Sequence, residues 1–533
     1  MLYAVGMFVK RARVGGHVYV QLMESYWLEG RARQRMVKSL GREERLDPAE
    51  VDRLVVALSR YGNARVVRDG DKAGGGAPRV RLYPGARVGS VWPLEALWSE
   101  LGLGGLLTEL ASGRRFAFSF PEVIKAIVFA RILQPGSERA LIQEWLPKVG
   151  LPALEGASLQ HAYRALAHLA SVGAELERRL VSTLTGKLFA DASLVLLTTT
   201  SVYFEGVGPE LASYGYSRDH RPDRRQVNLG LLTSREGVPL AHWLFPGRQS
   251  DVRSMALAAR DFRQRLGLGS LVVVADRGML SDANLTALQE DGIDYIIAER
   301  LRRKRTHQAL SRAGRYRRVA PHLEVAAAEL PTEIRVEGEE HVILCRNHER
   351  ADADRHTRET ILAKLESALQ EGSWRELLPP GTRRYLRVTG GQPSIDTKRV
   401  EQDAKYDGKW VLRTTTTLPP EDVAFAYRGL WRVETAFRTL KTPLEIRPVY
   451  HSSDAGVKGH LHTCILAYAL LRILEDRLDA AGLDMNAKQA LEALNNIQRA
   501  PLDIGQHHLE LTTTPNDQQR AILNALHTPI PQT

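Results

Sequence analysis

Four residues in the last quarter of the chain have types and spacing that could act on a phosphate. They are Tyr427, Glu434, Arg438 and Lys441. Their separations of seven, four and three positions place them on one face of a helix predicted for residues 421–440. On such a face Glu434 could hold a metal ion while the cations bind phosphates on either side of the reacting bond. The alternative is a solvated helix with favourable Glu/Arg and Glu/Lys pairs, which the spacing alone favours.

A second candidate carboxylate, Asp276, follows a short and continuously apolar run. Residues 271–275 predict a strand that is buried on both faces, and Asp276 comes directly after it. A carboxylate at the carboxyl end of a buried strand lies at the sheet edge where open α/β folds bind their ligands. The alternative is an aspartate that begins a turn into Arg277 and Gly278. Taken alone, the residue supports both interpretations equally.

The composition favours a partner with many negative charges. The chain has 533 residues, enough for three or more structural units, and its formal net charge is +11. Lysine and arginine gain affinity at phosphates because they release counterions, although charge alone does not distinguish nucleic acid from a membrane surface. Cys345 and Cys464 are too few for a disulfide framework and lack zinc-ligand spacing, so metal chemistry would have to use carboxylates.

The sequence contains no predicted membrane segment. The first 13 residues include a short apolar stretch without a cleavage site. No later run approaches the roughly 20 apolar residues of a spanning helix. We therefore expect a soluble, cytoplasmic protein without a membrane partner.

The N-terminal region predicts a β-hairpin followed by a helix. Apolar and polar residues alternate over 17–27 and again over 31–40, on either side of a short turn. The second strand would carry a basic face made of Arg31, Arg33 and Arg35. That face could be solvated or could contact DNA. After a helix at 48–61, residues 62–90 have the composition of a linker.

A mixed sheet with flanking helices is predicted in the middle of the chain. Helical apolar spacing between residues 91 and 190 changes to strand patterns at Ser193. The predicted elements are strands at 194–204, 226–233 and 238–245, a helix at 254–266, a strand at 271–275, a helix at 284–290 and a strand at 295–298. This β-β-β-α-β-α-β order matches the arrangement of ribonuclease-H-like domains.

The sequence therefore predicts a multidomain α+β and α/β protein whose ribonuclease-H-like core is interrupted. Its parts are an N-terminal hairpin and helix at 1–61, a linker at 62–90, a helical domain at 91–190, the core at 191–299 and 418–480, a β-rich insertion at 300–417 and a helical C-terminal extension at 481–533. The insertion begins with a basic cluster, Arg302, Arg303, Lys304 and Arg305, and Arg315, Arg317 and Arg318 follow it.

Many short motifs, in order along nearly the whole chain, resemble one known family. They are Ser39-Leu40-Gly41-Arg42, Pro135-Gly136-Ser137, Ser201-Val202-Tyr203-Phe204-Glu205, Tyr214-Gly215-Tyr216-Ser217, Asp219-His220-Arg221-Pro222-Asp223 with Gln226, Gly237 with Pro239-Leu240, Pro246-Gly247 with Asp251, Ala275-Asp276-Arg277-Gly278, Asp407-Gly408, and Leu430-Trp431 with Val433-Glu434, Phe437-Arg438, Lys441 and Arg447-Pro448. The chain resembles the DDE transposases of bacterial insertion sequences. It is similar to the superfamily whose third acid lies in a Tyr-Arg-Glu-Lys signature and whose core carries a β-rich insertion.

The resemblance implies an activity and a role for individual residues. It implies metal-dependent cleavage and strand transfer at the ends of an element, with Mg²⁺ or Mn²⁺ and on double-stranded DNA. It also implies that the protein binds this DNA as a homodimer. The helical domain would contact the DNA ends or the second subunit. The family's second and third acids fall on Asp276 and Glu434, which would bind the metal. The signature arginine falls on Leu430, so its role would pass to Arg432 or Arg438. The residues that would bind DNA are Tyr427, Arg432, Arg438, Lys441, Arg302, Arg303, Lys304 and Arg305.

The family's first acid is missing from this chain. The matching position on the first core strand is Thr198, within a run of three threonines. Asp191 and Glu205 each lie seven residues away, which on a strand means roughly 23 Å and the opposite face. A threonine hydroxyl supplies neither the negative charge nor the bridge that a metal pair needs. We therefore expect weak metal binding and strongly reduced chemistry.

Two functions from different classes fit these features. The first is a transposase, in which activated water hydrolyses a phosphodiester at the element end and the freed 3′ hydroxyl attacks target DNA. The alternative is a DNA-binding protein of transposase descent that no longer cuts and instead occupies or represses element ends. A general nuclease is less favoured, because the additional domains exceed what hydrolysis requires. Thr198 is the residue that separates the first two.

Overall fold

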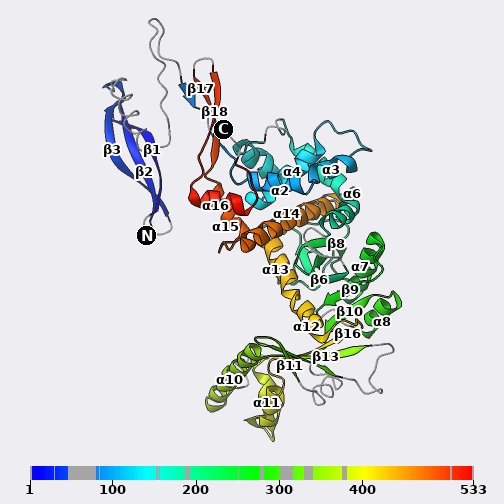
Figure 1. Ribbon diagram of the computed structural model, residues 1–533. Coiled ribbons are helices and arrows are strands. Elements are labelled where there is room, and N and C mark those ends of the chain that lie inside the picture. Colours follow the sequence, from blue (N-terminus) through cyan, green and yellow to red (C-terminus); the bar gives the residue numbers. More distant parts are fainter. Residues whose placement is uncertain are drawn as a thin grey trace. The chain divides into compact units, whose positions relative to one another are not determined.

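The computed structural model divides into two compact units, Met1–Arg79 and Val80–Thr533 (Figure 1). It describes residues 3–28, 31–45, 80–82, 85–151, 154, 156–185, 193–249, 251–276, 281–299, 316–328, 340–374, 381–504 and 507–530. The predicted features that lie outside these residues include the helix at 48–61, Asp191, the Arg277-Gly278 pair, the basic cluster at 302–305 and Arg315.

The first unit contains a three-stranded antiparallel sheet in which β2 lies between β1 and β3. The strands are β1 (Tyr3–Val14), β2 (His17–Leu28) and β3 (Arg31–Arg42). β2 and β3 form the predicted hairpin, whereas β1 was not predicted as a strand. Gly15 and Gly16 join β1 to β2 with φ angles of 58° and 83°. This left-handed backbone suits a two-residue hairpin turn and favours glycine at both positions.

The second unit is built on a nine-stranded sheet with the order β11-β12-β13-β16-β10-β9-β6-β7-β8. Five of these strands are those predicted for the core: β6 (Leu194–Tyr203), β7 (Gln226–Ser234), β8 (Pro239–Pro246), β9 (Val272–Ala275) and β10 (Asp294–Ala298). β6, β7 and β8 are antiparallel neighbours, and β9 and β10 extend the sheet from β6 in parallel. The helices α7 (Asp251–Leu266) and α8 (Asp282–Glu290) precede β9 and β10. The predicted order of elements and the mixed sheet are confirmed.

The inserted residues 300–417 contribute strands to this same sheet and are not only β-rich. The strands that continue the sheet are β11 (Arg317–Ala320), β12 (Leu323–Ala328), β13 (His341–Asn347) and β16 (Lys409–Thr414). β14 (Leu386–Thr389) and β15 (Gln392–Ile395) form a separate two-stranded sheet. β16 pairs antiparallel with β10 and so attaches the insertion to the core. The helices α10 (His348–Gln370) and α11 (Thr397–Ala404) correct the β-rich prediction. The apolar residues of α10 are concentrated in its second half, at Ile361, Leu362, Leu365, Ala368 and Leu369, so its first half lacks the apolar stripe that identifies a helix.

A buried group of charges joins the inserted strands to the core. Arg413 on β16 is 0% exposed, and its Nε and Nη1 donate to Glu340 Oε1 at 2.6 Å and to Glu299 Oε2 at 3.1 Å. Tyr295 on β10 donates its hydroxyl to the same Glu340 oxygen at 2.8 Å. Burial acts to lower the pKa of Arg413, but the hydrogen bond to Glu340 and the nearby carboxylates outweigh it and raise that pKa. The guanidinium therefore stays charged and compensates two buried carboxylates.

Replacing Arg413 by methionine should strongly destabilise the protein, because it leaves Glu299 and Glu340 buried without their cation. The expected loss in the free energy of unfolding is about 3–5 kcal/mol, measured by urea denaturation of the full chain. Arg317→Met is the matched control, since Arg317 is 65% exposed in its ion pair with Glu421 and such pairs contribute about 0–1 kcal/mol. Similar losses in the two variants would contradict a stabilising role for the buried group.

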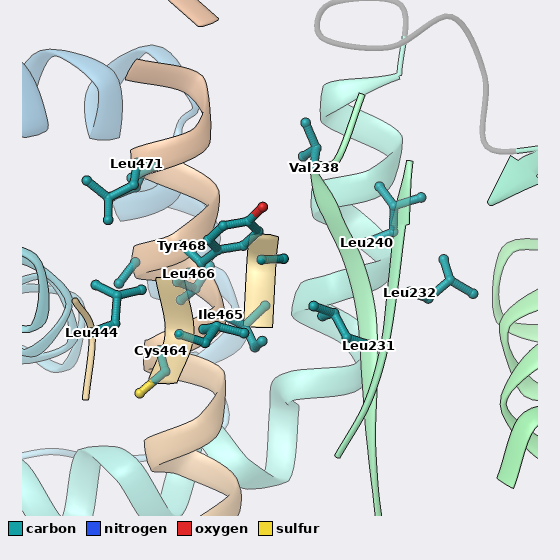
Figure 2. Close-up of a cluster of buried hydrophobic side chains, with 14 of the residues drawn as sticks. Leu231, Leu232, Val238, Leu240, Leu444, Cys464, Ile465, Leu466, Tyr468 and Leu471 are labelled. Carbon is teal, nitrogen blue, oxygen red and sulfur yellow. The ribbon is translucent and has the colours of Figure 1, made fainter. Parts of the chain in front are cut away.

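A long helix after the sheet packs against the helices that precede the sheet. The preceding helices are α2 (Trp92–Glu100), α3 (Leu103–Leu110), α4 (Phe120–Leu133), α5 (Glu138–Ala140) and α6 (Leu159–Leu184). The long helix, α14 (Asp454–Ala480), contacts α6, α4 and β8. Figure 2 shows buried side chains of α14, among them Ile465 and Tyr468, in one cluster with Leu231 and Leu240 of the β7–β8 hairpin. α14 therefore links the helices and the sheet through a shared hydrophobic core. No described helix is long and apolar enough to cross a membrane.

The beginning and end of the second unit pair in a small sheet. Its strands are β4 (Val80–Leu82), β5 (Ala86–Arg87), β17 (Gln498–Ile504) and β18 (His507–Thr512). β17 pairs antiparallel with each of the others. The helices α15 (Ala487–Leu494) and α16 (Asp517–Ala525) both contact α14. The predicted linker thus ends in two short strands, and the C-terminal extension contains a hairpin in addition to the expected helices.

Candidate active site

Adjacent strands bring Thr198 and Asp276 together. β6 and β9 run parallel, and their register pairs Leu196 with Val274. Two residues further along, the same register places Thr198 beside Asp276, which directly follows β9. Thr198 is half-buried and Asp276 is exposed. The two residues therefore lie on neighbouring segments of the sheet.

The helix predicted at residues 421–440 is in fact two helices. α12 (Pro420–Arg428) and α13 (Leu430–Lys441) meet at Gly429. Gly429 keeps a helical backbone, with φ −60° and ψ −18°, so the sequence periodicity runs through the junction without revealing it. A Cβ added at Gly429 would lie 3.4 Å from the Leu196 side chain, which shows that the junction lies against β6.

Tyr427, in the last turn of α12, contacts Asp276. Its hydroxyl donates to Asp276 Oδ1 at 3.3 Å, across a separation of 151 residues. α12 also packs on β9 and β10. The contact therefore ties the segment after the insertion to the strand end before it. Because Glu434 lies on α13, the proposed stripe from Tyr427 to Lys441 spans two helices and not one continuous face.

α13 packs on the face of β6 to which Thr198 belongs. Its residues Val433, Ala436, Phe437 and Leu440 are buried, and α13 contacts β6 and β7. Leu196, which lies against the α12–α13 junction, is two positions before Thr198, so the two side chains share one face of the strand. Glu434 is exposed. Its carboxylate is accessible to solvent on the helix that covers Thr198, and its role as third acid stays a prediction.

The three cations of α13 are engaged by the protein to different degrees. Arg432 Nη1 donates to the carbonyl oxygen of Arg235 at 2.8 Å. Lys441 Nζ donates to Asp219 Oδ1 at 2.8 Å, and the two side chains are 13% and 6% exposed. Burial lowers the pKa of Lys441 below its ordinary value. Arg438 is exposed, so it is the most accessible of the three for a phosphate.

Asp219 is an acid to which the sequence assigned no role. Arg447 Nε lies 3.0 Å from the same Asp219 oxygen that Lys441 contacts. The loop that carries Asp219 lies against the end of β6, because the backbone N–H of Arg218 donates to Ser201 Oγ at 2.9 Å. Asp219 is thus held by two cations near the end of β6. It does not take the position beside Asp276, which Thr198 occupies.

Of the two other acids near Thr198 in the sequence, Glu205 is the one that the described residues include. Glu205 lies beyond the end of β6 and pairs with Arg224 at 3.1 Å. Asp191 lies outside the described residues. Glu205 is therefore not a replacement for the missing acid.

Two buried clusters of glutamate and histidine were not predicted from the sequence. They are Glu138 with His451 and His460, and Glu177 with His242 and His462, and in each the potential ligand atoms lie within 4.8 Å of one another. Burial opposes ionisation of Glu138, but its hydrogen bond with His451 and the nearby histidines lower its pKa to about 2. Each cluster draws residues from distant elements.

Comparisons with known proteins find two families. The transposase DDE domain matches residues 184–470, and the N-terminal domain of IS1634 family transposases matches residues 9–70. A protein of Sinorhizobium fredii that is named as a transposase, y4zB, is 30% identical over 104 residues, which are 19% of this chain and 29% of that protein. The cryo-EM structure of the piggyBac transposase synaptic complex with hairpin DNA is 10% identical, with a TM-score of 0.37 over 78% of this chain and 82% of that chain.

Proposed function

Because the chain belongs to the family of transposases with a DDE domain, we propose that it binds the ends of an insertion sequence and that Thr198 has removed most of its ability to cut DNA. The observation that carries this proposal is the parallel register of β6 and β9, which pairs Leu196 with Val274 and, continued by two residues, reaches Thr198 and Asp276. A hydroxyl would then lie where a bridging carboxylate is needed.

The strand order supports a ribonuclease-H-like core. Three antiparallel strands, β6 to β8, are followed by β9 and β10, which are parallel to β6 and separated by helices. This is the β-β-β-α-β-α-β order expected of such a core. Within it, Asp276 and Glu434 would be the second and third acids.

The donors at this site fit a single, weakly held divalent ion better than a metal pair. Asp276 and Glu434 would supply two carboxylates, whereas Thr198 adds one neutral hydroxyl. Mg²⁺ and Mn²⁺ prefer carboxylate and water oxygens, but two ions roughly 3.5–4 Å apart need a shared carboxylate that is missing beside Asp276. A bound ion would activate water and stabilise charge on the phosphate. Tyr427 would orient Asp276, and Arg438 would bind a phosphate.

A DNA-binding protein that no longer cuts is the second candidate function, and Thr198 favours it. Both functions require recognition of element ends, for which we propose a homodimer on double-stranded DNA. Strand cleavage and joining distinguish them. The full chain, incubated with DNA that carries both ends of its element and with Mn²⁺, should bind those ends and cleave them near background. Robust cleavage would refute the impairment, and equal binding to scrambled DNA would refute end recognition.

DNA affinity should fall steeply with salt if the basic residues contact phosphates. The expected slope of log affinity against log salt is roughly 0.9 per phosphate neutralised on duplex DNA. Charge reversal of Arg302, Arg303, Lys304 and Arg305 should flatten that slope by up to roughly 3.6, as measured by fluorescence anisotropy at several salt concentrations.

A matched charge reversal on α10 tests whether this effect is local. Arg350, Arg355 and Lys364 are exposed there, and their reversal should change the slope much less. If the slope changed equally per reversed charge at both places, the cluster at 302–305 would contribute only to the overall electrostatic field of the protein.

A further inference from the structure

The cluster of Glu177, His242 and His462 lies where α6, β8 and α14 meet. Glu177 Oε1 is 2.5 Å from His242 Nδ1 and 3.8 Å from His462 Nδ1. The three side chains are 10%, 4% and 12% exposed. Two imidazole nitrogens and one carboxylate oxygen therefore lie together in a nearly dry part of the second unit. None of these residues belongs to the proposed carboxylate site.

The donors of this cluster are poorly satisfied by one another. His242 Nδ1 is buried and forms no hydrogen bond of acceptable geometry within the described residues, although Glu177 is close. The two imidazole rings have centroids 4.4 Å apart and an interplanar angle of 74°, and both direct Nδ1 toward the same oxygen. In a tetrahedral site with bonds of roughly 2.0–2.1 Å, neighbouring donors are roughly 3.3 Å apart. The distances from Glu177 Oε1 to His242 Nδ1 and to His462 Nδ1, 2.5 Å and 3.8 Å, lie below and above that value.

Two further hydrogen bonds, one from Arg265 and one from the main chain of His242, orient the carboxylate. Arg265 Nη1 donates to Glu177 Oε2 at 3.0 Å, and the backbone N–H of His242 donates to Glu177 Oε1 at 3.3 Å. Such outer hydrogen bonds commonly fix the orientation of a ligating carboxylate. The oxygen that faces both histidines is thus held in place.

Arg265 connects the cluster to a second carboxylate. Its Nη2 lies 2.6 Å from Asp261 Oδ2, and the Asp261 side chain is 44% exposed. The buried carboxylate of Glu177 therefore has Arg265 at one oxygen, while its other oxygen faces the two histidines.

A small cavity lies beside the cluster. It has a volume of about 30 Å³ and is lined by Glu177 and His462 together with apolar residues such as Leu180, Leu240 and Ile465. Because its wall is almost entirely apolar, a water molecule there would need a metal ion as its polar partner. Such a water would supply the fourth ligand of a tetrahedral site.

The other buried cluster differs in its central histidine. His460 Nδ1 lies 3.4 Å from Arg131 Nη2, and His460 Nε2 lies 3.2 Å from the carbonyl oxygen of Ile446, so both nitrogens of that ring have partners. Glu138 Oε1, in contrast, is buried without a hydrogen bond of acceptable geometry within the described residues. The cluster of Glu138, His451 and His460 serves as an internal comparison.

We propose that Glu177, His242 and His462 form a buried site for Zn²⁺ or a similar first-row dication, which fixes the junction of α6, β8 and α14. Two nitrogens and one oxygen suit Zn²⁺ and Co²⁺, whereas Mg²⁺ prefers oxygen ligands. The site is thus chemically distinct from the proposed Mg²⁺ or Mn²⁺ site at Asp276. Its role is structural and does not depend on DNA cleavage.

Co²⁺ titration of the full chain, after treatment with a chelator, tests the proposal. One equivalent of Co²⁺ should produce the visible absorption of a tetrahedral site, and Zn²⁺ but not Mg²⁺ should displace it. Zn²⁺ should also raise Tm by a few degrees, because it binds only the folded state. The absence of both the absorption and the Tm shift in the natural protein would overturn the proposal, whatever the variants do.

Four variants locate the ion. His242→Gln and Glu177→Gln should each weaken Zn²⁺ binding by roughly 100-fold or more, because loss of a direct ligand should exceed the roughly 10–100-fold cost of losing an outer partner. His451→Gln, in the comparison cluster, and Asp276→Asn, in the carboxylate site, should leave the Co²⁺ spectrum unchanged. Loss of the spectrum in either of these two would place the ion elsewhere and overturn the assignment.

Discussion

Thr198→Asp should give the chain metal-dependent cleavage at its element ends. An aspartate is close in size to threonine and would lie beside Asp276 on the neighbouring parallel strand. It would restore the shared carboxylate that two metal ions require. Since loss of an outer partner of a metal ligand already costs roughly 10–100-fold, we expect a gain of roughly 100-fold or more over the natural protein. Strand cleavage of end DNA in Mn²⁺, followed on denaturing gels, measures it.

Three further variants separate charge from packing at this position. Thr198→Asn adds the same bulk without the charge and should not restore cleavage. Thr198→Ala should change little, because the hydroxyl contributes little to metal binding. Asp276→Asn, introduced together with Thr198→Asp, should abolish the gained activity. DNA binding should survive in all of them. Strong cleavage by the natural protein that persists in Thr198→Ala but disappears in Asp276→Ala would mean that another carboxylate completes the site.

The core strands could be predicted because their burial leaves a simple pattern in the sequence. The apolar run at residues 271–275 and the turn between β7 and β8 identify strands from local sequence alone. The neighbouring positions of Thr198 and Asp276 then follow from parallel strand pairing. α10 was not predicted, although its second half has apolar residues at helical spacing, because its first half is polar and charged on every side.

The parts of the site that escaped prediction depend on contacts between distant residues. The ion pair between Lys441 and Asp219 joins positions 222 residues apart, and it engages a lysine that was expected to bind a phosphate. Gly429 divides the predicted helix without changing its helical backbone, so apolar periodicity does not reveal the junction. The cluster of Glu177, His242 and His462 assembles from three elements and has no spacing signature in the sequence.

The crossing of α6 and α14 depends on two glycines. A Cβ added at Gly459 would lie 2.2 Å from the carbonyl oxygen of Leu166, and one added at Gly173 would lie 1.9 Å from His462 Nε2. The carbonyl oxygen of Leu166 belongs to the main chain, so no change of side-chain rotamer can relieve the clash at Gly459. The clash at Gly173 is with the His462 ring, which is 12% exposed. The two helices can therefore approach this closely only while both positions lack a side chain.

Gly459→Ala should destabilise the protein by about 3 kcal/mol or more, since overpacking costs about 1–3 kcal/mol even where side chains can move. The same substitution in an unobstructed helix stabilises by about 0.5–1 kcal/mol, because alanine has the higher helix propensity. Gly105 on α3 provides the matched control, as a Cβ there meets nothing within 4 Å, and Gly105→Ala should be as stable as the natural protein or slightly more so. Urea denaturation followed by tryptophan fluorescence measures both variants. If Gly459→Ala proved as stable as Gly105→Ala, the backbones of α6 and α14 would not meet at Gly459, and the close crossing of these helices would be wrong.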